Sequence, residues 1–382
     1  MSHHVLVLAG GSGTRLWPAS RQASPKHLLP IGPGGITLLR ATVNRVLPLT
    51  SRVRVVTAGG QADLCRAALA NLAFAGDPIV AEPTARGTGP ALGLAVRSIL
   101  GDDPDAVISS VHADAHIRDD EAYRAAVVAA AGWAEITGGL ATVGLTPTYP
   151  AVGFGYIEFA GPPLSAAMWS PPSGVTADPR LAAAAAAAPA FRAARFVEKP
   201  ALDAAAEYMT SGRHLWNTGL FAWPGRRFWE EFAAADPTLA AGIDEVVTLR
   251  RGGREAAASA AYAALPNIAI EPLVFERTPR LTVVQAGFGW SDLGSFSDLH
   301  DARRESGEGD AHGNVVTGDV LAIDVGNSLL VAAAGRLLAV VGMRDVVAVD
   351  TGDAVLVMPR QDSQRIKEVV EQLRTKGRTE LL

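Results

Sequence analysis

The sequence predicts an α/β fold with a mixed, mostly parallel sheet, followed by a small β-rich module at the C-terminal end. In the first half, short β-branched runs alternate with longer helical patterns, as in parallel sheets that are covered by helices. From residue 313 onward, valine-rich runs are separated by Gly, Asn or Asp at intervals of roughly ten residues, as in stacked β-coils or a small β-sandwich. We therefore expect two domains, residues 1–305 and 306–382.

The first half of the chain contains the elements that define this sheet. Strands are expected at residues 5–9, 53–57, 79–81, 106–110 and 140–143. Helices are expected at residues 38–46, 62–72, 90–99 and 121–136. Three unusual loops, starting at Gly10, Glu82 and Val111, follow predicted strands. Since ligands bind at the carboxyl ends of parallel strands, these loops should converge on one edge of the sheet.

Two later segments are less regular. Residues 160–194 combine several prolines with the alanine run 182–188, which favours a helix that ends at Pro189. We interpret this segment as a surface excursion of low functional weight. Near the end of the chain, residues 363–374 form an amphipathic pattern that predicts a helix.

Composition excludes several classes of protein. The 382 residues carry a net charge of −5, which argues against a dedicated nucleic-acid surface. The single cysteine, Cys65, excludes an intrachain disulfide and is expected to pack in the core. No secretion signal or membrane span is predicted, because the apolar runs are short or interrupted. We expect a cytoplasmic protein that binds small molecules, with no nucleic-acid or membrane partner.

Residues 8–30, LAGGSGTRLWPASRQASPKHLLP, form a glycine-rich loop directly after the first strand. Glycines there allow backbone N–H groups to approach an anion closely, although GGSG alone could also form a plain tight turn. The dinucleotide fingerprint fails at Leu16, and no P-loop lysine follows the glycines. Arg15 and Lys26 are the strong cations of the loop, and we expect Arg21 to be solvated.

The combination of GGSGTRLWP and SPKHLLP resembles the sugar-1-phosphate nucleotidyltransferases, and among them the mannose-1-phosphate guanylyltransferases. The resemblance implies a Rossmann-like catalytic domain and a left-handed β-helix-like C-terminal module. It also implies transfer of GMP from GTP to α-D-mannose 1-phosphate, giving GDP-mannose and pyrophosphate with Mg²⁺. Because the sequence stops at Leu382, we expect no isomerase domain of the kind fused to some relatives.

The nucleotide site that the resemblance implies begins in the loop. Arg15 and Lys26 would neutralise the departing phosphates. In EPTARGTGPAL, Glu82 would accept hydrogen bonds from the N1–H and 2-amino groups of guanine, although the segment could simply start a helix. The expected nucleotide-binding residues are Leu8, Ala9, Gly10, Gly11, Gly13, Thr14, Arg15, Lys26, Glu82, Gly87, Thr88 and Asp114.

Two aspartates match the magnesium ligands of the family. Asp114 lies in SSVHADAHI, and Asp292 lies in GFGWSDLGSF. Mg²⁺ binds through one or two carboxylates together with substrate phosphates, which suits this pair. Asp292 could alternatively cap a helix. With Arg15 and Lys26, these aspartates make up the expected catalytic set.

The sugar phosphate is assigned to three further motifs, GFGYI, FVEKP and WNTGLFAW. By resemblance, Gly155, Glu198 and Asn217 hold the mannose hydroxyls, and Lys199 pairs with the phosphate. A carboxylate and an amide can discriminate the geometry of hydroxyl groups, and an ammonium can fix the attacking phosphate.

Three other functions stay open at this stage. The chain could transfer a uridylyl or thymidylyl group to another sugar 1-phosphate. It could be a metallohydrolase that binds zinc through His112, Asp114 and His116. It could also be a non-catalytic regulatory paralogue that binds GDP-mannose. The C-terminal module could be a lid on the larger domain or a dimer contact, and we expect a homodimer.

Overall fold

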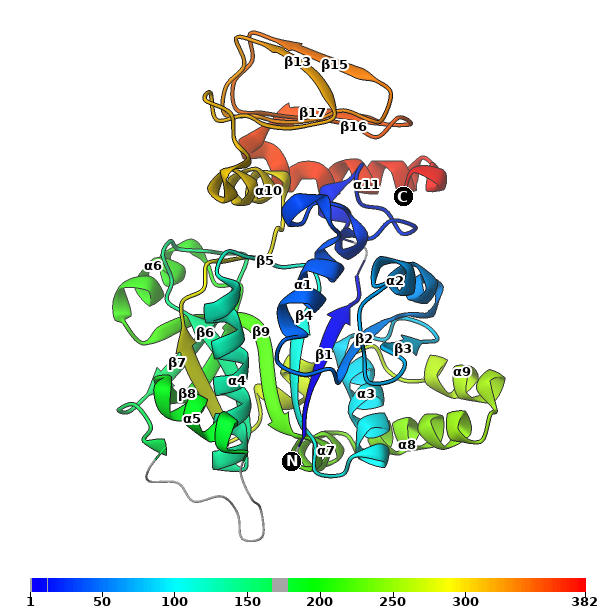
Figure 1. Cartoon of the computed structure of the whole chain (residues 1–382), viewed down its shortest axis with the longest axis vertical. Coiled ribbons are helices and arrows are strands. Elements are labelled where there is room, and N and C mark those ends of the chain that lie inside the picture. The colour runs from blue at the N-terminus through cyan, green and yellow to red at the C-terminus, as the bar shows by residue number, and fades with distance from the viewer. Residues whose placement is uncertain (1, 12, 167–177) are drawn as a thin grey trace. The chain divides into compact units, whose positions relative to one another are not determined.

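A computed structural model describes residues 2–11, 13–166 and 178–382 (Figure 1). By internal contacts the chain forms two compact units, each assembled from segments that are distant in sequence. Unit 1 comprises Met1–Gly10, Val43–His112 and Asp119–Phe288. Unit 2 comprises Gly11–Thr42, Ala113–Arg118 and Gly289–Leu382. The expected domain boundary at residue 305 stays a prediction.

Unit 1 is built on a nine-stranded mixed sheet in the order β3-β2-β1-β4-β9-β6-β10-β8-β7. The strands are β1 (His3–Ala9), β2 (Val53–Ala58), β3 (Ile79–Glu82), β4 (Val107–His112), β6 (Leu140–Leu145), β7 (Gly155–Ala160), β8 (Ala190–Glu198), β9 (His214–Pro224) and β10 (Leu281–Ala286). Neighbours from β3 to β4 are parallel, as are β6 and β10. Strand β9 runs antiparallel between β4 and β6 and makes the sheet mixed.

Helices cover this sheet. They are α1 (Leu38–Val46), which continues from unit 2 into unit 1, and α2 (Ala62–Ala68), α3 (Thr88–Asp102), α4 (Asp120–Thr137), α5 (Pro179–Ala187), α6 (Leu202–Ser211), α7 (Gly225–Ala235), α8 (Pro237–Arg251) and α9 (Glu255–Ala263). One large apolar core joins α3, α7 and α8 to the strands, with Trp223, Phe228 and Phe232 fully buried. The predicted strands and helices of the first half are all present. Two of the predicted loop starts are wrong, because Glu82 ends β3 and Val111 lies inside β4.

The segment predicted as a surface excursion is only partly one. Its alanine run is helical, as predicted, but α5 packs on α4 with Leu181 and Ala185 buried. Strand β8 already begins at Ala190, which pairs with β10. The prediction failed there because alanines are small enough to allow close helix packing. Residues 167–177 lie outside the described residues.

Unit 2 contains the β-rich module. Besides the start of α1, the helices and strands of unit 2 are β5 (His116–Ile117), β11 (Trp290–Ser291), α10 (Phe296–Arg303), β12 (Val315–Thr317), β13 (Asp319–Ile323), β14 (Leu329–Val331), β15 (Leu337–Val341), β16 (Val346–Asp350), β17 (Val355–Pro359) and α11 (Ile366–Thr375). Strands β12, β14 and β16 pair in parallel, as do β13 and β15. This pairing confirms stacked β-coils. Helix α11 confirms most of the helix predicted at residues 363–374, with its start shifted because residues up to Arg365 form a 3-10 turn.

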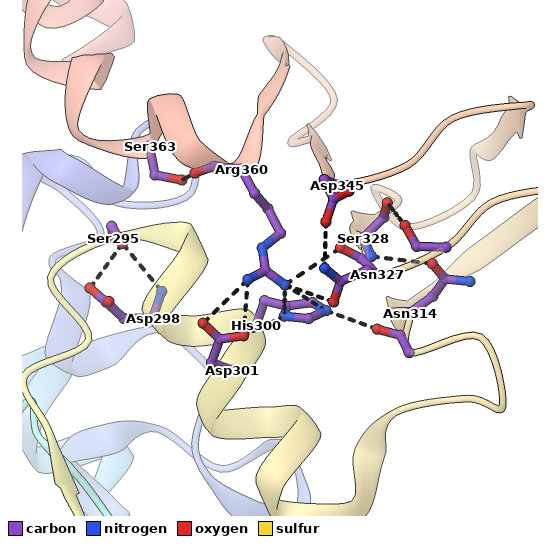
Figure 2. A network of polar contacts seen from close by, with 12 residues as sticks. Ser295, Asp298, His300, Asp301, Asn314, Asn327, Ser328, Asp345, Arg360 and Ser363 are labelled. Atoms are coloured by element: carbon purple, nitrogen blue, oxygen red, sulfur yellow. Dashed lines mark hydrogen bonds and ion pairs between the residues drawn. The ribbon is translucent and has the colours of Figure 1, made fainter. Parts of the chain in front are cut away.

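A polar network around the buried ring of His300 connects α10 to these coils (Figure 2). The fully buried ring of His300 bonds the carbonyl oxygen of Gly313 at 2.9 Å. The guanidinium of Arg360 pairs with Asp301 at 3.1 Å and donates to the side-chain oxygen of Asn327 at 3.1 Å. Because buried polar groups are costly when unpaired, this network favours one arrangement of α10 and the coils.

The apolar core of unit 2 joins its first segment, Gly11–Thr42, to its last, Gly289–Leu382. Leu16, Trp17 and Leu29 of the glycine-rich loop pack in one cluster with Leu293 and Phe296. The same cluster includes these residues of the coils and of α11: Val315, Leu329, Val347, Val349, Leu356, Ile366 and Val370. The loop is therefore folded onto the C-terminal residues. Within the described part of the chain, no helix is long and apolar enough to cross a membrane.

Candidate active site

The glycine-rich loop closes on itself between Gly13 and Lys26. Gly13 has a left-handed φ of 59°, and a Cβ atom added to it would collide with the side chain of Lys26. That atom would also lie 3.2 Å from the hydroxyl oxygen of Ser20. Gly13 is followed by a single 3-10 turn, Thr14–Leu16, instead of a long helix. Glycine at residue 13 thus lets the two ends of the loop touch.

Lys26 lies at the centre of a charged cluster, which we define as Arg15, Lys26, Asp114 and Asp292. Its side chain is only 8% exposed, and its ammonium lies 2.9 Å from Oδ2 of Asp114. The same ammonium donates to the main-chain oxygen of Asp292. Lys26 therefore contacts both aspartates that the sequence predicted as metal ligands, and all members of the cluster belong to unit 2.

A short strand pairing brings the two aspartates together. In the antiparallel pair β5 and β11, His116 lies opposite Ser291, and Ile117 lies opposite Trp290. Continuing this register would place Asp292 opposite Ala115, the residue after Asp114, and Lys26 contacts both aspartates there. The prediction that residues 178 positions apart share a site thus has a local structural basis.

Arg15 reaches the same place from the loop. A Cβ atom built on Gly294 would lie 3.1 Å from a guanidinium nitrogen of Arg15 and 2.9 Å from a carboxylate oxygen of Asp292. Asp292 also accepts a hydrogen bond from the backbone N–H of Gly294 at 3.1 Å. The alternative that Asp292 caps the next helix is wrong, because Ser295 is the residue that caps α10.

The cluster fits a hard divalent cation. Asp114 and Asp292 supply carboxylate oxygens, the ligand type that Mg²⁺ prefers. The ammonium of Lys26 already lies between Asp114 and the backbone of Asp292, which shows that this position attracts positive charge. His27, the next residue, adds no charge at neutral pH because burial lowers its pKa to about 4.

The histidines of the H-x-D-x-H stretch do not complete a zinc site. His112 packs against the backbone bulge at Gly219, where an added Cβ would lie 2.5 Å from its Nε2. His116 faces the hydroxyl of Ser306 at 3.5 Å. In residues 2–11, 13–166 and 178–382, no three His, Cys, Asp or Glu side chains gather as a metal-binding group. The geometry therefore gives the metallohydrolase alternative no ligand set.

The predicted base-recognition residues lie in unit 1. Glu82 is buried at the end of β3, and its carboxylate accepts a hydrogen bond from the hydroxyl of Tyr262 at 2.6 Å. Burial raises the pKa of Glu82, and the Tyr262 hydrogen bond opposes that rise. Tyr262 was not identified from the sequence, because it lies 180 residues away on α9.

Gly87 and Thr88 have clear structural contacts of their own. A Cβ on Gly87 would lie 2.5 Å from the carbonyl oxygen of Ile268, and Gly87 has a φ of 80°. The hydroxyl of Thr88 accepts a hydrogen bond from the backbone N–H of Ile270 at 2.8 Å. These contacts join the start of α3 to residues 268–270. Their role with a nucleotide stays a prediction, as does that of Leu8, Ala9, Gly10, Gly11 and Thr14 at the end of β1 and beyond it.

The predicted sugar-phosphate residues do come together in unit 1. Gly155 pairs with Glu198 across β7 and β8, and a Cβ on Gly155 would lie 2.6 Å from the Glu198 carboxylate and 3.5 Å from Cβ of Asn217. The ammonium of Lys199 lies 2.6 Å from the other carboxylate oxygen of Glu198. Lys199 and Glu198 are both exposed, so a ligand can reach them.

An aromatic group adjoins these strands and was not predicted. The ring of Trp216, one residue before Asn217, lies 4.8 Å from Tyr149 and 5.4 Å from Phe154. Tyr149 is half exposed, at 50%. No sequence pattern indicated this group, because its members come from the loop between β6 and β7 and from the distant strand β9.

Arg21, predicted to be solvated, is instead engaged within unit 2. Its guanidinium binds both carboxylate oxygens of Asp353, at 2.5 and 2.7 Å. The side chain of Arg21 is only 15% exposed. The prediction was wrong because the partner is 332 residues away in sequence.

Family models match both the larger part of the chain and its C-terminal part. A family model described as nucleotidyl transferase matches residues 4–308, and a model described as a MannoseP isomerase/GMP-like beta-helix domain matches residues 318–373. The xanthan biosynthesis protein XanB of Xanthomonas campestris pv. campestris (strain B100) is 36% identical over 381 residues, covering 98% of this chain and 74% of XanB.

Two further relatives match over 98% of this chain. The mannose-1-phosphate guanylyltransferase of Escherichia coli (strain K12) is 34% identical over 98% of this chain and 74% of its own. The crystal structure of a protein from Thermus thermophilus, described as a mannose-1-phosphate geranyltransferase, is 31% identical with a TM-score of 0.79, covering 98% of this chain and 100% of that one. The chain is thus an enzyme of the nucleotidyl transferase family, with a β-helix module at its C-terminal end.

Proposed function

We propose that this enzyme transfers GMP from GTP to α-D-mannose 1-phosphate, releasing GDP-mannose and pyrophosphate, with Mg²⁺ as the cofactor. The observation that carries the proposal is the charged cluster, in which Lys26 contacts Asp114 and the backbone of Asp292, with Arg15 beside Asp292. Two acids and two cations in one compact unit are the groups that a reaction between two phosphates needs. The E. coli relative, named for this activity, supports the choice of substrates.

The reaction needs no protein nucleophile, because an oxygen of the sugar phosphate is already anionic. That oxygen forms a bond to the α-phosphorus of GTP, and the bond from the α-phosphorus to the bridging oxygen breaks to release pyrophosphate. Arg15 and Lys26 stabilise the charge on the departing pyrophosphate. When bound by Asp114 and Asp292, Mg²⁺ would reduce the repulsion between the two phosphates.

Lys26 has to change partners for this role. In the structure its ammonium neutralises Asp114, at 2.9 Å. With Asp114 engaged in holding a divalent ion, the Lys26 ammonium would be free to move to the phosphates. The lysine at the end of the glycine-rich loop is therefore well placed to respond to the arrival of metal and nucleotide together.

Recognition of the base and the sugar is assigned to unit 1. We assign the guanine to Glu82, Gly87 and Thr88, and the mannose 1-phosphate to Gly155, Glu198, Asn217 and Lys199. The pairing of Gly155 with Glu198 supports the sugar assignment, since only a residue without a side chain leaves the Glu198 carboxylate its present position. Lys199, exposed beside Glu198, would pair with the phosphate.

A substrate panel tests the proposal. GTP, ATP, UTP and dTTP are each combined with mannose 1-phosphate or glucose 1-phosphate, with and without Mg²⁺, and pyrophosphate release is measured. The proposal predicts the highest kcat/KM for GTP with mannose 1-phosphate and no turnover without a divalent cation. A preference for UTP or dTTP would establish the uridylyl or thymidylyl alternative, and binding of GDP-mannose without turnover would establish the regulatory one.

We also propose that the enzyme is a cytoplasmic homodimer. The outer face of β13 and β15 carries Leu321, Ile323, Leu337 and Val341, which are 47 to 62% exposed. Such a row of apolar side chains favours burial against a second copy. Sedimentation velocity of the wild type and of Leu337→Glu tests this, with a dimer expected for the first and a monomer for the second.

A further inference from the structure

The glycine-rich loop is tied to the C-terminal coils at its midpoint, between the two cations that it carries. Arg21 binds both carboxylate oxygens of Asp353 and donates to the hydroxyl of Thr351 at 3.2 Å. Its Nε also donates to the carbonyl oxygen of Pro18 at 3.1 Å, within the loop itself. We call Arg21, Thr351 and Asp353 the loop anchor. All three guanidinium nitrogens donate hydrogen bonds, which fixes the orientation of the group.

The coil side of the anchor is rigid. Asp353 lies in the tight turn between β16 and β17, where the N–H of Thr351 donates to the carbonyl oxygen of Ala354 at 3.0 Å. The Thr351 hydroxyl donates to the Asp353 carboxylate at 3.0 Å. The hydrogen bond from Arg21 lowers the pKa of Asp353 to about 2, so that the pair stays ionised at neutral pH. This turn therefore offers a fixed, charged point of attachment.

The loop side of the anchor contains little regular secondary structure. Residues 13–29, all of which the structure describes, form single 3-10 turns and no strand. Arg21 and Ser24 exchange two backbone hydrogen bonds, of 3.0 and 3.1 Å, that close one tight turn. A second tie from the loop to the chain end is the indole N–H of Trp17, which donates to the carbonyl oxygen of Leu381 at 2.7 Å. The position of the loop thus depends on contacts with distant residues.

We propose that Arg21 is a positioning residue for the nucleotidyl transfer, and that the coil turn at Asp353 acts through it to place Arg15 and Lys26. The inference rests on the proposed function, because it concerns the phosphates that those two cations would bind. It gives the C-terminal module a part in catalysis, in addition to any role as a lid or dimer contact. A partly exposed ion pair contributes little to stability, whereas displacing catalytic groups by an ångström has a large effect on rate.

A double-mutant cycle tests the proposal. Arg21→Met, Asp353→Asn and the double variant are compared with wild type by pyrophosphate release. Each single variant should lower kcat about 10- to 100-fold and leave the KM for mannose 1-phosphate unchanged. The double variant should be no worse than the single ones, because the anchor is lost already. Arg21→Lys, which keeps the charge without the two-pronged geometry, should recover only part of kcat.

Controls separate positioning from general damage. Glu368→Gln removes an exposed ion pair with Arg365 on the same module and should leave kcat unchanged. Thermal unfolding should show all variants folded at the assay temperature. Hydrogen exchange of peptides within residues 13–29 should be faster in both anchor variants than in wild type or Glu368→Gln.

Each outcome bears on one claim. Wild-type kcat in the anchor variants, or reductions that multiply in the double variant, would overturn the positioning role. If wild type releases no pyrophosphate with any substrate pair, the proposed function fails, and hydrogen exchange alone then decides whether the anchor holds the loop. Unchanged exchange across residues 13–29 would show that it does not.

Discussion

Replacing Lys26 by methionine should separate the catalytic role of the ammonium from its structural one. Methionine has nearly the same length as lysine, so that the packing against Gly13 is kept. The ammonium makes two charge-assisted contacts in the structure, to Asp114 and to the main chain of Asp292. In the reaction it would exchange these for contacts with the departing phosphates. The substitution therefore removes one cation from the transition state.

The expected effects on rate and on stability differ in size. Loss of a charge-assisted contact made in the transition state costs about 3 kcal/mol, which lowers kcat by roughly two orders of magnitude. Asp114 is 37% exposed, and water can solvate it when Lys26 is gone. The free energy of unfolding should therefore fall by only about 1 kcal/mol.

Pyrophosphate release at saturating GTP and mannose 1-phosphate gives kcat, and urea unfolding gives the stability. Lys376→Met, which changes an exposed lysine at the end of α11, is the matched control and should behave as wild type. A second measurement is the affinity of the nucleotide-free protein for Mn²⁺, followed by its electron paramagnetic resonance. Lys26→Met should bind Mn²⁺ more tightly than wild type, because the ammonium no longer competes with the metal for Asp114. A kcat within threefold of wild type, together with unchanged Mn²⁺ affinity, would refute the reasoning.

Three more predictions concern the metal, the base and the pH. Asp292→Asn should raise the Mg²⁺ concentration for half-maximal activity about tenfold or more, as measured by metal titration of pyrophosphate release. Glu82→Gln should lower the ratio of kcat/KM for GTP over ITP about tenfold, because ITP lacks the 2-amino group whose hydrogen bond the carboxylate would accept. Burial lowers the pKa of His3 to about 4. Below about pH 6.5, the His3 side chain therefore binds a proton in the unfolded chain but not in the folded protein. His3 alone should therefore lower the stability by about 2 kcal/mol between pH 7 and pH 5. The buried His27, whose pKa is also about 4, adds a similar amount, so His3→Gln should lose less stability than wild type in urea unfolding over the same pH range but should not become pH-independent.

The elements of unit 1 were predictable because their signals are local. The strands β1, β2 and β4 are short runs of buried β-branched residues, and α4 carries its apolar side chains at helical spacing. The predicted ends of the strands were less accurate. Glu82 and Val111 were placed in loops because the strands before them were predicted to end at residues 81 and 110, but pairing with neighbouring strands extends β3 and β4 across these positions.

The contacts that join distant segments were not predictable from residue patterns. The pairing of Arg21 with Asp353 spans 332 positions, and the hydrogen bond from Tyr262 to Glu82 spans 180. Neither partner belongs to a motif that points to the other. The sugar-phosphate residues were predicted one by one from a resemblance, but their meeting depends on the register of β7, β8 and β9. Register is decided by the whole sheet and not by the local sequence.

The two aspartates of the charged cluster depend on a strand pairing that cannot be stable alone. β5 and β11 contain two residues each, far fewer than an independent hairpin needs. What holds them is the surrounding packing, since Ile117 is buried and Leu293 and Phe296 lie in the apolar core of unit 2. That core is completed by Val347, Val349 and the other C-terminal residues of the same cluster. The geometry of Asp114 and Asp292 therefore depends on packing against the β-coils as much as on the loops that carry them, although all four residues of the charged cluster lie within the first 305.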